Sequence, residues 1–588
     1  MTDTKQSRLT ATLLCVTPPD EHQEQGIRAF LQKKYGEDVA LTIQQDSSLK
    51  SGFQLHVGSE VYDWSAKGRM EQFRQQVEQL VAKNTRKDII PLLRSSIDEF
   101  RLLAKSSEVG TVKSIGDGIA VVEGLEHAAY GEILMFDNGI KGMVQDLRRN
   151  ETGCILFDNA DDISAGSKVA RTGKTAGVPV GDAFLGRVVD ALGRPIDGGD
   201  AIPADGYRPV EEPAPGIIDR QSVDTPMETG LLSIDAMFPI GRGQRELIIG
   251  DRQTGKTAIA LDAMLNQKGK NVICVYVAIG QKASSVAQLV ENLRKRDAMD
   301  YCVVVSATAG EADTMQYIAP YAGCAMAEYY MHKGRDVLIV YDDLSKHAIA
   351  YRAMSLLLER APGREAYPGD VFYLHSRLLE RSAHLSDKLG GGSMTALPIV
   401  ETQAGDVSAY IPTNIISITD GQIFLESDLF FAGQRPAVNV GLSVSRVGGA
   451  AQTKATKKAT GSLRLDLAQY REMEVFTQFS SDLDDSTKEQ LHYGQGLMRI
   501  LRQKQYHPLS MHQQVIVLVC AMGHVLSKVA VNDVTDFRDA LLDHFEQEHS
   551  DLCRSLEDEK VLTDDMKQEI LRIAEAFRTA NAERFRKE

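Results

Sequence analysis

The chain has 588 residues, of which 43% are hydrophobic and 25% are charged, and its formal net charge is −15. The length predicts about three or four globular domains, and the acidic balance disfavours a nucleic-acid motor, which needs a basic stripe or channel. Seven scattered cysteines without a CxxC pair favour reduced thiols over a disulfide framework or a zinc site.

The first region, residues 1–84, has the pattern of a small α+β domain. Its β-like runs and helical patterns occupy, in order along the sequence, residues 10–16, 21–35, 39–44, 54–57, 59–63 and 65–82. Trp64, the only tryptophan, lies just before the last helical pattern, and we expect it to anchor the core of this domain. The amphipathic segment 85–105 predicts a linker helix.

Residues 106–175 have an all-β pattern. Short alternating runs are separated by the turn signals Gly-Asp-Gly at 116–118, Asn-Gly at 138–139 and Ala-Gly-Ser at 165–167. This spacing predicts a small β-barrel of the six-stranded type.

Residues 176–460 alternate strand patterns with helical patterns, which is typical of an α/β domain. Gly250–Thr257 reads Gly-Asp-Arg-Gln-Thr-Gly-Lys-Thr, a complete GxxxxGK[ST] phosphate loop between an apolar run and a helical run. Strand, glycine loop and helix are the context in which backbone N–H groups and a helix N-terminus bind phosphate. We expect Lys256 to reach the β- and γ-phosphates and Thr257 to ligate magnesium. The protein is therefore predicted to bind a nucleoside triphosphate.

Besides the Thr257 hydroxyl, a carboxylate is needed to hold magnesium through water. The apolar, β-branched run Asp336–Asp342 predicts a buried parallel strand, and Asp342 ends it. Ligands of open α/β sheets bind at the carboxyl ends of the strands, so we expect Asp342 at the metal. The alternative is that Asp342 only caps the next helix.

Arg446 ends the alternating run Val438–Val447, which predicts a strand leading into a glycine turn. In phosphate-loop hexamers an arginine in such a place commonly reaches the γ-phosphate of a neighbouring subunit. From spacing alone, an arginine at a strand end is more often a solvated charge.

From residue 461 to 588 strand signals are absent and apolar residues recur at helical spacing, which predicts a helical domain. The longest apolar run, Val515–Met522, is too short to span a bilayer, and the N-terminus carries no apolar signal segment. We therefore expect membrane association only through partners. The four regions predict a multidomain α/β protein: a small N-terminal α+β domain, a β-barrel, a phosphate-loop nucleotide-binding domain and a C-terminal helical domain.

Four blocks of this sequence resemble the α subunit of F-type ATP synthase, and the resemblance runs from about residue 86 to the end. They are Pro239–Thr257, Tyr341–Lys346, Pro362–Phe372 and Pro436–Gln452. The resemblance implies a hexamer of alternating α and β subunits around a γ shaft, with a δ subunit and b subunits in a peripheral stalk. It implies ATP or ADP with magnesium, no nucleic acid, a rotor that carries protons or sodium ions, and a peripheral place on the cytoplasmic face of the cell inner membrane.

The resemblance also implies roles for individual residues at a non-catalytic nucleotide site. The residues that would bind the nucleotide are Arg252, Gln253, Thr254, Gly255, Lys256, Thr257 and Asp342, with Arg435, Gln503 and Gln505 around the adenine. Thr257 and Asp342 would also hold the metal. Arg446 would be an arginine finger that this subunit delivers into the neighbouring β site.

Gln281 decides whether this subunit is itself catalytic. The β family has a glutamate in a Gly-Glu-Arg block that polarises the attacking water, whereas the matching block here is Ala278-Ile-Gly-Gln281-Lys282. An amide cannot take up the proton, and a missing general base typically costs 10²–10⁴-fold in rate. The protein is therefore expected to bind ATP and barely hydrolyse it alone.

Two other classes of function are alternatives. A self-sufficient ring ATPase, either a secretion motor or a termination helicase, keeps its catalytic carboxylate in the same polypeptide that binds ATP, so Gln281 and the acidic charge argue against it. A non-hydrolytic scaffold outside any synthase would have no use for Arg446.

The N-terminal region carries a second resemblance. The segments Asp46–Gly52 and Val57–Arg69 resemble the C-terminal domain of the ATP synthase δ subunit, in which a turn, a hairpin and a serine-capped helix follow in that order. The resemblance implies that residues 1–84 link the head of the complex to its peripheral stalk. The alternative is an unrelated decoration.

Overall fold

The computed structural model describes residues 10–19, 21–35, 39–49, 51–58, 60–65, 68, 106–137, 139–158, 163–477 and 485–585. The protein divides into two compact units, residues 1–176 and 177–588, which we treat separately. The expected linker helix at 85–105 lies outside the described residues, as does the expected helix at 65–82 apart from Ser65 and Gly68. Among the helices of these described ranges, none combines the length and apolarity needed to cross a bilayer.

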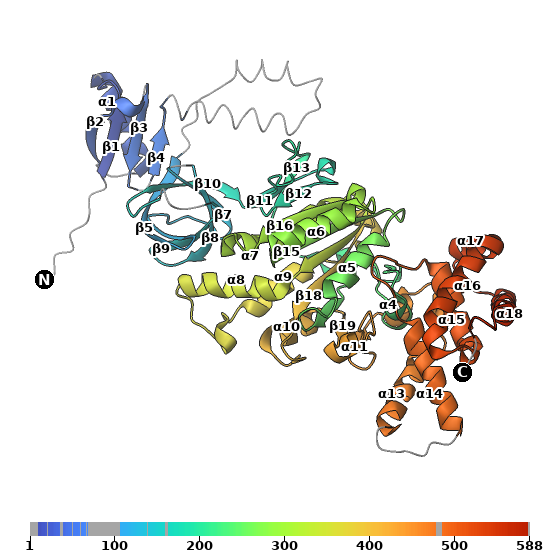
Figure 1. The fold of residues 1–588 in the computed structure, drawn as a ribbon. Helices are drawn as coiled ribbons and strands as arrows, with labels where there is room; N and C mark the ends of the chain where they lie inside the picture. Colours follow the sequence, from blue (N-terminus) through green and yellow to red (C-terminus); the bar gives the residue numbers. More distant parts are fainter. Residues whose placement is uncertain are drawn as a thin grey trace. The chain divides into compact units, whose positions relative to one another are not determined.

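The N-terminal region is the small α+β domain that the sequence predicts (Figure 1). Its elements are β1 (Thr10–Cys15), α1 (Glu21–Tyr35), β2 (Ala40–Gln45), β3 (Phe53–Val57) and β4 (Glu60–Asp63). Strands β1 and β2 are parallel and joined through α1, whereas β3 and β4 add as an antiparallel hairpin. Trp64 packs its ring 4.9 Å from Phe53 and 5.9 Å from Tyr62, centroid to centroid, as expected of a core anchor.

The barrel follows with six strands. They are β5 (Ser106–Gly116), β6 (Ile119–Glu123), β7 (Glu132–Phe136), β8 (Lys141–Leu147), β9 (Glu151–Leu156) and β10 (Lys168–Thr175). The strand order β10-β7-β8-β9-β6-β5 closes through the pairing of β10 with β5. The turn between β5 and β6 needs left-handed backbone at Asp117 and Gly118, with φ of 47° and 77°, which explains the Gly-Asp-Gly signal.

Strand β5 belongs to both sheets of this unit. Its first residues, 106–108, pair with β4 of the N-terminal domain, and its later residues pair with β10 and β6 of the barrel. The result is a single run of ten strands, ordered β10-β7-β8-β9-β6-β5-β4-β3-β1-β2. The N-terminal domain is therefore hydrogen-bonded to the barrel, an arrangement that the predicted division at residue 106 does not convey.

The second unit opens with the nucleotide-binding domain. Its strands are β11 (Gly177–Val180), β12 (Val188–Asp190), β13 (Gly206–Pro209), β14 (Leu247–Gly250), β15 (Val272–Gln281), β16 (Cys302–Thr308), β17 (Asp336–Asp342), β18 (Ser393–Glu401), β19 (Gly421–Leu425) and β20 (Val444–Ser445). Its helices are α4 (Leu232–Met237), α5 (Lys256–Leu265), α6 (Ala283–Arg294), α7 (Asp313–Met331), α8 (Leu344–Leu357), α9 (Val371–Leu379), α10 (Tyr410–Ile418) and α11 (Ser427–Phe431).

The central sheet of this domain has the order β12-β16-β15-β17-β18-β14-β19-β20, and only β20 pairs antiparallel with its neighbour. Strands β14, β15 and β17 are buried almost throughout, because helices cover the parallel sheet (Figure 1). The expected strand at 438–447 is wrong except for Val444 and Ser445. Asn439 accounts for part of the difference, because its side chain accepts the N–H groups of Gly441 and Leu442 and turns the backbone.

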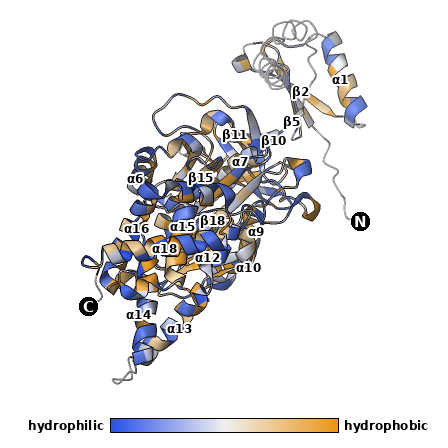
Figure 2. Ribbon diagram, turned by 90° about the vertical axis from the view of Figure 1, so that its right-hand side faces the viewer, coloured by the Kyte–Doolittle hydropathy of each residue, from blue (hydrophilic) through white to orange (hydrophobic). Residues whose placement is uncertain are grey.

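The C-terminal region is helical, as predicted. It consists of α12 (Lys454–Thr460), α13 (Leu463–Thr477), α14 (Asp485–Ile500), α15 (Met511–Met522), α16 (Val534–Glu548), α17 (Ser550–Glu559) and α18 (Asp564–Ala580). Helix α15 contains the apolar run noted in the sequence; its residues are mostly buried, and it packs against α12, α16, α17 and α18. Figure 2 colours these helices by hydropathy. Ser510 and Gln513 form a capping box at its start.

Two fully buried histidines in the nucleotide-binding domain predict acid sensitivity. His347 of α8 donates from Nε2 to the Tyr317 carbonyl at 3.0 Å, and the His375 ring of α9 lies 5.4 Å away, centroid to centroid. Neither ring nitrogen of His375 has a hydrogen-bond partner among the described residues. Burial lowers the pKa of His347 well below 6.5 and that of His375 to about 3.

The free energy of unfolding is therefore expected to fall as the pH drops below 6.5, because these histidines are then protonated in the unfolded protein but stay neutral in the folded protein. For His375 the loss at pH 5 is about 2 kcal/mol. Urea unfolding of the full-length protein at pH 7.5 and pH 5 measures it, and His375→Leu should reduce the difference between the two pH values. Leu374, buried on the same helix as His375, offers the control, since Leu374→Ala removes no titratable group and should leave the difference unchanged. An equal pH difference in wild type and His375→Leu would contradict this explanation.

Candidate nucleotide-binding site

The phosphate loop joins the buried strand β14 to helix α5, whose first residue is Lys256. Gln253 and Gly255 adopt left-handed backbone with φ of 62° and 95°, and the curl turns the loop around the helix N-terminus. The carboxylate of Asp251 binds the loop to the segments that follow β18 and β19. It accepts the Thr402 hydroxyl at 2.6 Å and the Ser427 hydroxyl at 3.0 Å.

The Lys256 side chain reaches back from the start of α5 to the first residues of the phosphate loop. Its Nζ donates to the Gly250 carbonyl at 2.8 Å and to the Asp251 carbonyl. Burial lowers the pKa of Lys256, while the nearby carboxylates of Glu401, Asp343 and others oppose that change. The ammonium is thus within reach of a bound phosphate and surrounded by acidic groups that favour its charged form.

Asp342 and Thr257 meet directly. The Thr257 hydroxyl donates to Asp342 Oδ2 at 2.7 Å, and Asp342 is almost fully buried at the carboxyl end of β17. Asp343, rather than Asp342, caps α8 by accepting the Lys346 N–H at 2.8 Å, so the capping alternative belongs to the neighbouring residue. A hydroxyl and a carboxylate are the hard oxygen ligands that Mg²⁺ prefers, so this pair fits the metal chemically.

Two further side chains hold Asp342 in place. Tyr276 donates its hydroxyl to Oδ2 at 2.5 Å, and Gln281 donates its amide nitrogen to Oδ1 at 2.9 Å. Gln281 ends β15, the strand beside β17, which brings the amide to the edge of the sheet where Asp342 lies. Gln281 therefore acts as a hydrogen-bond donor to the Asp342 carboxylate and not as a base.

Glu401 completes the acidic side of the site, and the sequence motifs do not single it out. It ends β18, next to the phosphate-loop strand, and pairs with the guanidinium of Arg252. Arg252 is otherwise exposed, with 80% of its side chain accessible to solvent. The signal for Glu401 is the same as for Asp342, since both carboxylates end buried apolar strands. Tyr276 lies inside a strand and gives no such signal.

The three residues expected around the adenine lie on two neighbouring segments. Arg435 places its guanidinium carbon 4.4 Å from the centroid of the Phe430 ring, and that ring borders Gly255 of the phosphate loop. Gln503 donates its backbone N–H to the Arg435 carbonyl at 2.9 Å. The Gln503 side chain points elsewhere, to the backbone of residues 230 and 232. Gln505 is exposed.

Arg446 lies apart from this group. It follows β20 at the edge of the sheet, its backbone N–H donates to the Asp420 carbonyl at 2.9 Å, and its side chain is exposed. Within the part of the protein that the structure describes, no hydrogen bond or ion pair joins its guanidinium to the phosphate loop. The Arg446 guanidinium is thus available to contact a group that does not belong to the phosphate loop of its own subunit.

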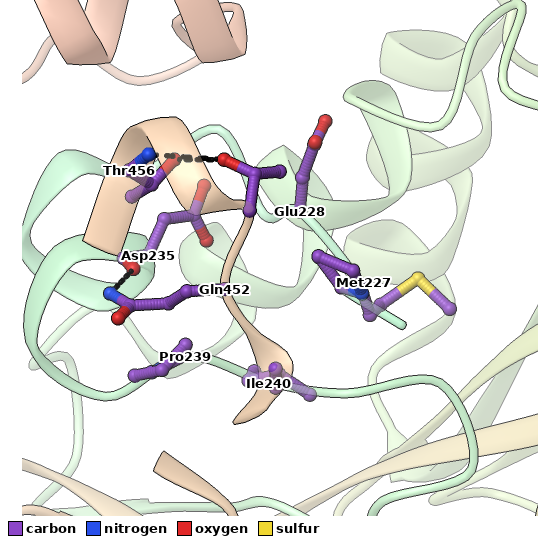
Figure 3. Close-up of a pocket in the computed structure, with 10 residues that line it drawn as sticks. Met227, Glu228, Asp235, Pro239, Ile240, Gln452 and Thr456 are labelled. Atoms are coloured by element: carbon purple, nitrogen blue, oxygen red, sulfur yellow. Dashed lines mark hydrogen bonds between the residues drawn. The ribbon is translucent and has the colours of Figure 1, made fainter. Parts of the chain in front are cut away.

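A hollow of about 240 Å³ lies between residues 226–240 and 451–456 (Figure 3). Gln452 donates across it to the Asp235 carbonyl at 3.0 Å. Burial raises the pKa of Asp235, and hydrogen bonds from Thr229 and Gln514 oppose the rise. The hollow contains none of the expected site residues. It marks the junction of two domains and not the nucleotide site.

Four family models, which describe two protein families, match successive parts of the sequence. The first is "ATP synthase delta (OSCP) subunit", which matches residues 1–77. Three models of the ATP synthase alpha/beta family follow: its β-barrel domain at 105–173, its nucleotide-binding domain at 230–445 and its C-terminal domain at 452–577.

Curated proteins of high similarity carry one name. ATP synthase subunit alpha of Clostridium botulinum is 58% identical over 483 residues, which cover 82% of this protein and 96% of the relative. ATP synthase subunit alpha of Clostridium kluyveri is 56% identical over 491 residues, which cover 84% of this protein and 97% of the relative.

Proposed function

Since this chain belongs to the family of F-type ATP synthase α subunits, we propose that its phosphate loop is a non-catalytic site that binds ATP or ADP with magnesium. The observation that carries the proposal is the hydrogen bond from the Gln281 amide to Asp342 Oδ1 at 2.9 Å. The bond supports the proposal because a neutral amide that donates a hydrogen bond cannot polarise water as the carboxylate of a hydrolytic site does. A self-sufficient ring ATPase is disfavoured for the same reason.

At this site, the backbone N–H groups of the loop and the N-terminus of α5 bind the phosphates. Lys256 exchanges its contacts with the Gly250 and Asp251 carbonyls for phosphate oxygens. Thr257 and Asp342 hold magnesium, which neutralises phosphate charge when bound. Arg252, Gln253 and Thr254 form the remaining wall of the loop. Arg435 and Gln505, with the Phe430 ring, are proposed to face the base, next to the segment that carries Gln503.

Arg446 is proposed to serve the catalytic site of the neighbouring β subunit as an arginine finger. Its exposure at the sheet edge supports this role, because a finger must reach beyond its own subunit. Large apolar side chains on α8 and α9, including Ile349 and Tyr373 at 47% and 62% exposed, support burial of these helices in an alternating ring. The ring would surround the γ shaft at the cytoplasmic face of the inner membrane.

The N-terminal domain is proposed to join the head to the peripheral stalk, together with the δ and b subunits. The match of residues 1–77 to the δ subunit supports this role, and so does the hydrogen-bonded junction between β4 and β5. A domain attached by a strand pair transmits load better than one on a loose tether.

The purified full-length protein is expected to bind magnesium–ATP and to show turnover at least about 10²–10⁴-fold below that of a complex with β-type subunits. Equilibrium binding of a fluorescent ATP analogue and a phosphate-release assay measure the two properties. Lys256→Ala is the binding control and should abolish the fluorescence change. Rapid phosphate release by the protein without a partner would refute the non-catalytic assignment.

A further inference from the structure

The loop between α14 and α15, residues 501–510, is bound to the nucleotide-binding domain at several points. Gln503 Oε1 accepts the Leu232 N–H at 2.6 Å, and Gln503 Nε2 donates to the Gly230 carbonyl at 2.9 Å. Leu509 donates its own N–H to the same carbonyl at 2.8 Å. The Gln503 side chain is therefore used to anchor this loop.

A third anchor comes from the helix that follows the phosphate loop. Asp262 lies on α5, is only 4% exposed, and accepts the backbone N–H of Tyr506 through Oδ1 at 2.8 Å. Burial raises the pKa of Asp262 to about 6, while the Tyr506 N–H and the charge of Arg296 oppose the rise. Asp262 is therefore not a solvated surface charge; its buried carboxyl joins α5 to the backbone of the 501–510 loop.

The backbone of Tyr506 has an unfavourable conformation that its surroundings must stabilise. Its φ of 68° lies in the left-handed region, which is unfavourable for a residue with a side chain. The guanidinium carbon of Arg296 lies 3.9 Å from its ring centroid, and Asn292 of α6 donates to its hydroxyl at 3.2 Å. Contacts from α5 and α6 therefore determine where the turn at Tyr506 sits.

We propose that Asp262 is a positioning residue that sets the distance between the 501–510 loop, beside the base, and the phosphate loop. Asp262 lies six positions after Lys256 on one helix, about 9 Å along its axis. The same rigid helix therefore positions the groups at both ends of the nucleotide. Gln505 lies next to Tyr506 and is positioned by the same turn. This inference rests on the proposed nucleotide site.

The test compares two ligands, magnesium–ATP and magnesium–tripolyphosphate, on the full-length protein. Asp262→Ala leaves the partly buried Tyr506 N–H without its acceptor and should weaken ATP binding by about ten- to a hundredfold. Tripolyphosphate has no base, so its affinity should stay unchanged. Asp262→Asn is the matched control, because its amide oxygen still accepts the N–H, and it should bind ATP nearly as tightly as wild type.

A second variant decides the matter if Asp262→Ala does not fold. Tyr506→Gly keeps the N–H and favours a positive φ, but it loses the contacts to Arg296 and Asn292, so ATP binding should weaken while tripolyphosphate binding is kept. An equal loss of both ligands in either variant would overturn the positioning role, and so would ATP binding as tight as wild type. If the wild-type protein bound neither ligand, the proposed nucleotide site itself would be wrong.

Discussion

Replacing Arg446 by alanine is expected to lower steady-state ATP turnover of the assembled complex by about 10³–10⁵-fold. The guanidinium lies exposed after β20 and apart from its own phosphate loop, so its loss should act on the neighbouring site, where charge develops on the transferred phosphoryl group. ATP binding to this subunit should not change, because Lys256, Thr257 and Asp342 remain. Turnover and nucleotide content of the purified complex measure both effects.

Two variants distinguish an arginine-finger role of Arg446 from a general effect of losing a positive charge. Arg446→Lys keeps the positive charge but loses the planar, two-pronged donor, so most of the turnover should still be lost. Arg554 lies on α17 and is also exposed, and Arg554→Ala should leave turnover as in wild type. Near wild-type turnover in Arg446→Ala would rule out the finger.

Deleting residues 1–84 is expected to abolish ATP-driven ion pumping by the membrane-bound complex while ATP hydrolysis by the soluble head continues. The barrel should survive the deletion, because β5 keeps its pairs with β6 and β10 when β4 is gone. Pumping into sealed vesicles, hydrolysis by the detached head and the subunit content of the purified complex are the three measurements.

Hydrolysis is the internal control of the deletion, since a head that no longer hydrolyses ATP would report misfolding. In the proposed ring, several copies of this domain would meet one stalk, so we expect the copies to be non-equivalent, with at least one at the stalk. Unchanged pumping together with a retained stalk would reduce the domain to a decoration.

The sequence is most informative where a backbone requirement selects residue types. The phosphate loop and the strand ending in Asp342 could be predicted because glycines, a helix start and a run of β-branched residues each leave a local pattern. The N-terminal strands were predicted to within a residue or two for the same reason. The strand expected at 438–447 failed because alternation alone does not reveal that Asn439 turns the backbone with its side chain.

Contacts made across the fold could not be predicted. Tyr276 reaches Asp342 from the middle of a neighbouring strand, and Asp262 reaches Tyr506 over 244 positions of sequence. Gln503 was expected beside the adenine, yet its amide is engaged by Gly230 and Leu232. No local pattern distinguishes a side chain that faces a ligand from one that joins two domains.

Strand β5 has a mechanical consequence. Hydrogen bonds of an antiparallel pair run across the strands, so a pull along β5 loads its ladders in shear, with several bonds sharing the force at once. A sideways pull instead opens the β4–β5 pair one bond at a time, like a zipper. The junction between the N-terminal domain and the barrel should therefore resist force along the strand axis and yield to force across it. Strand β5 would then transmit force between the barrel and a partner bound to the N-terminal domain mainly along one direction.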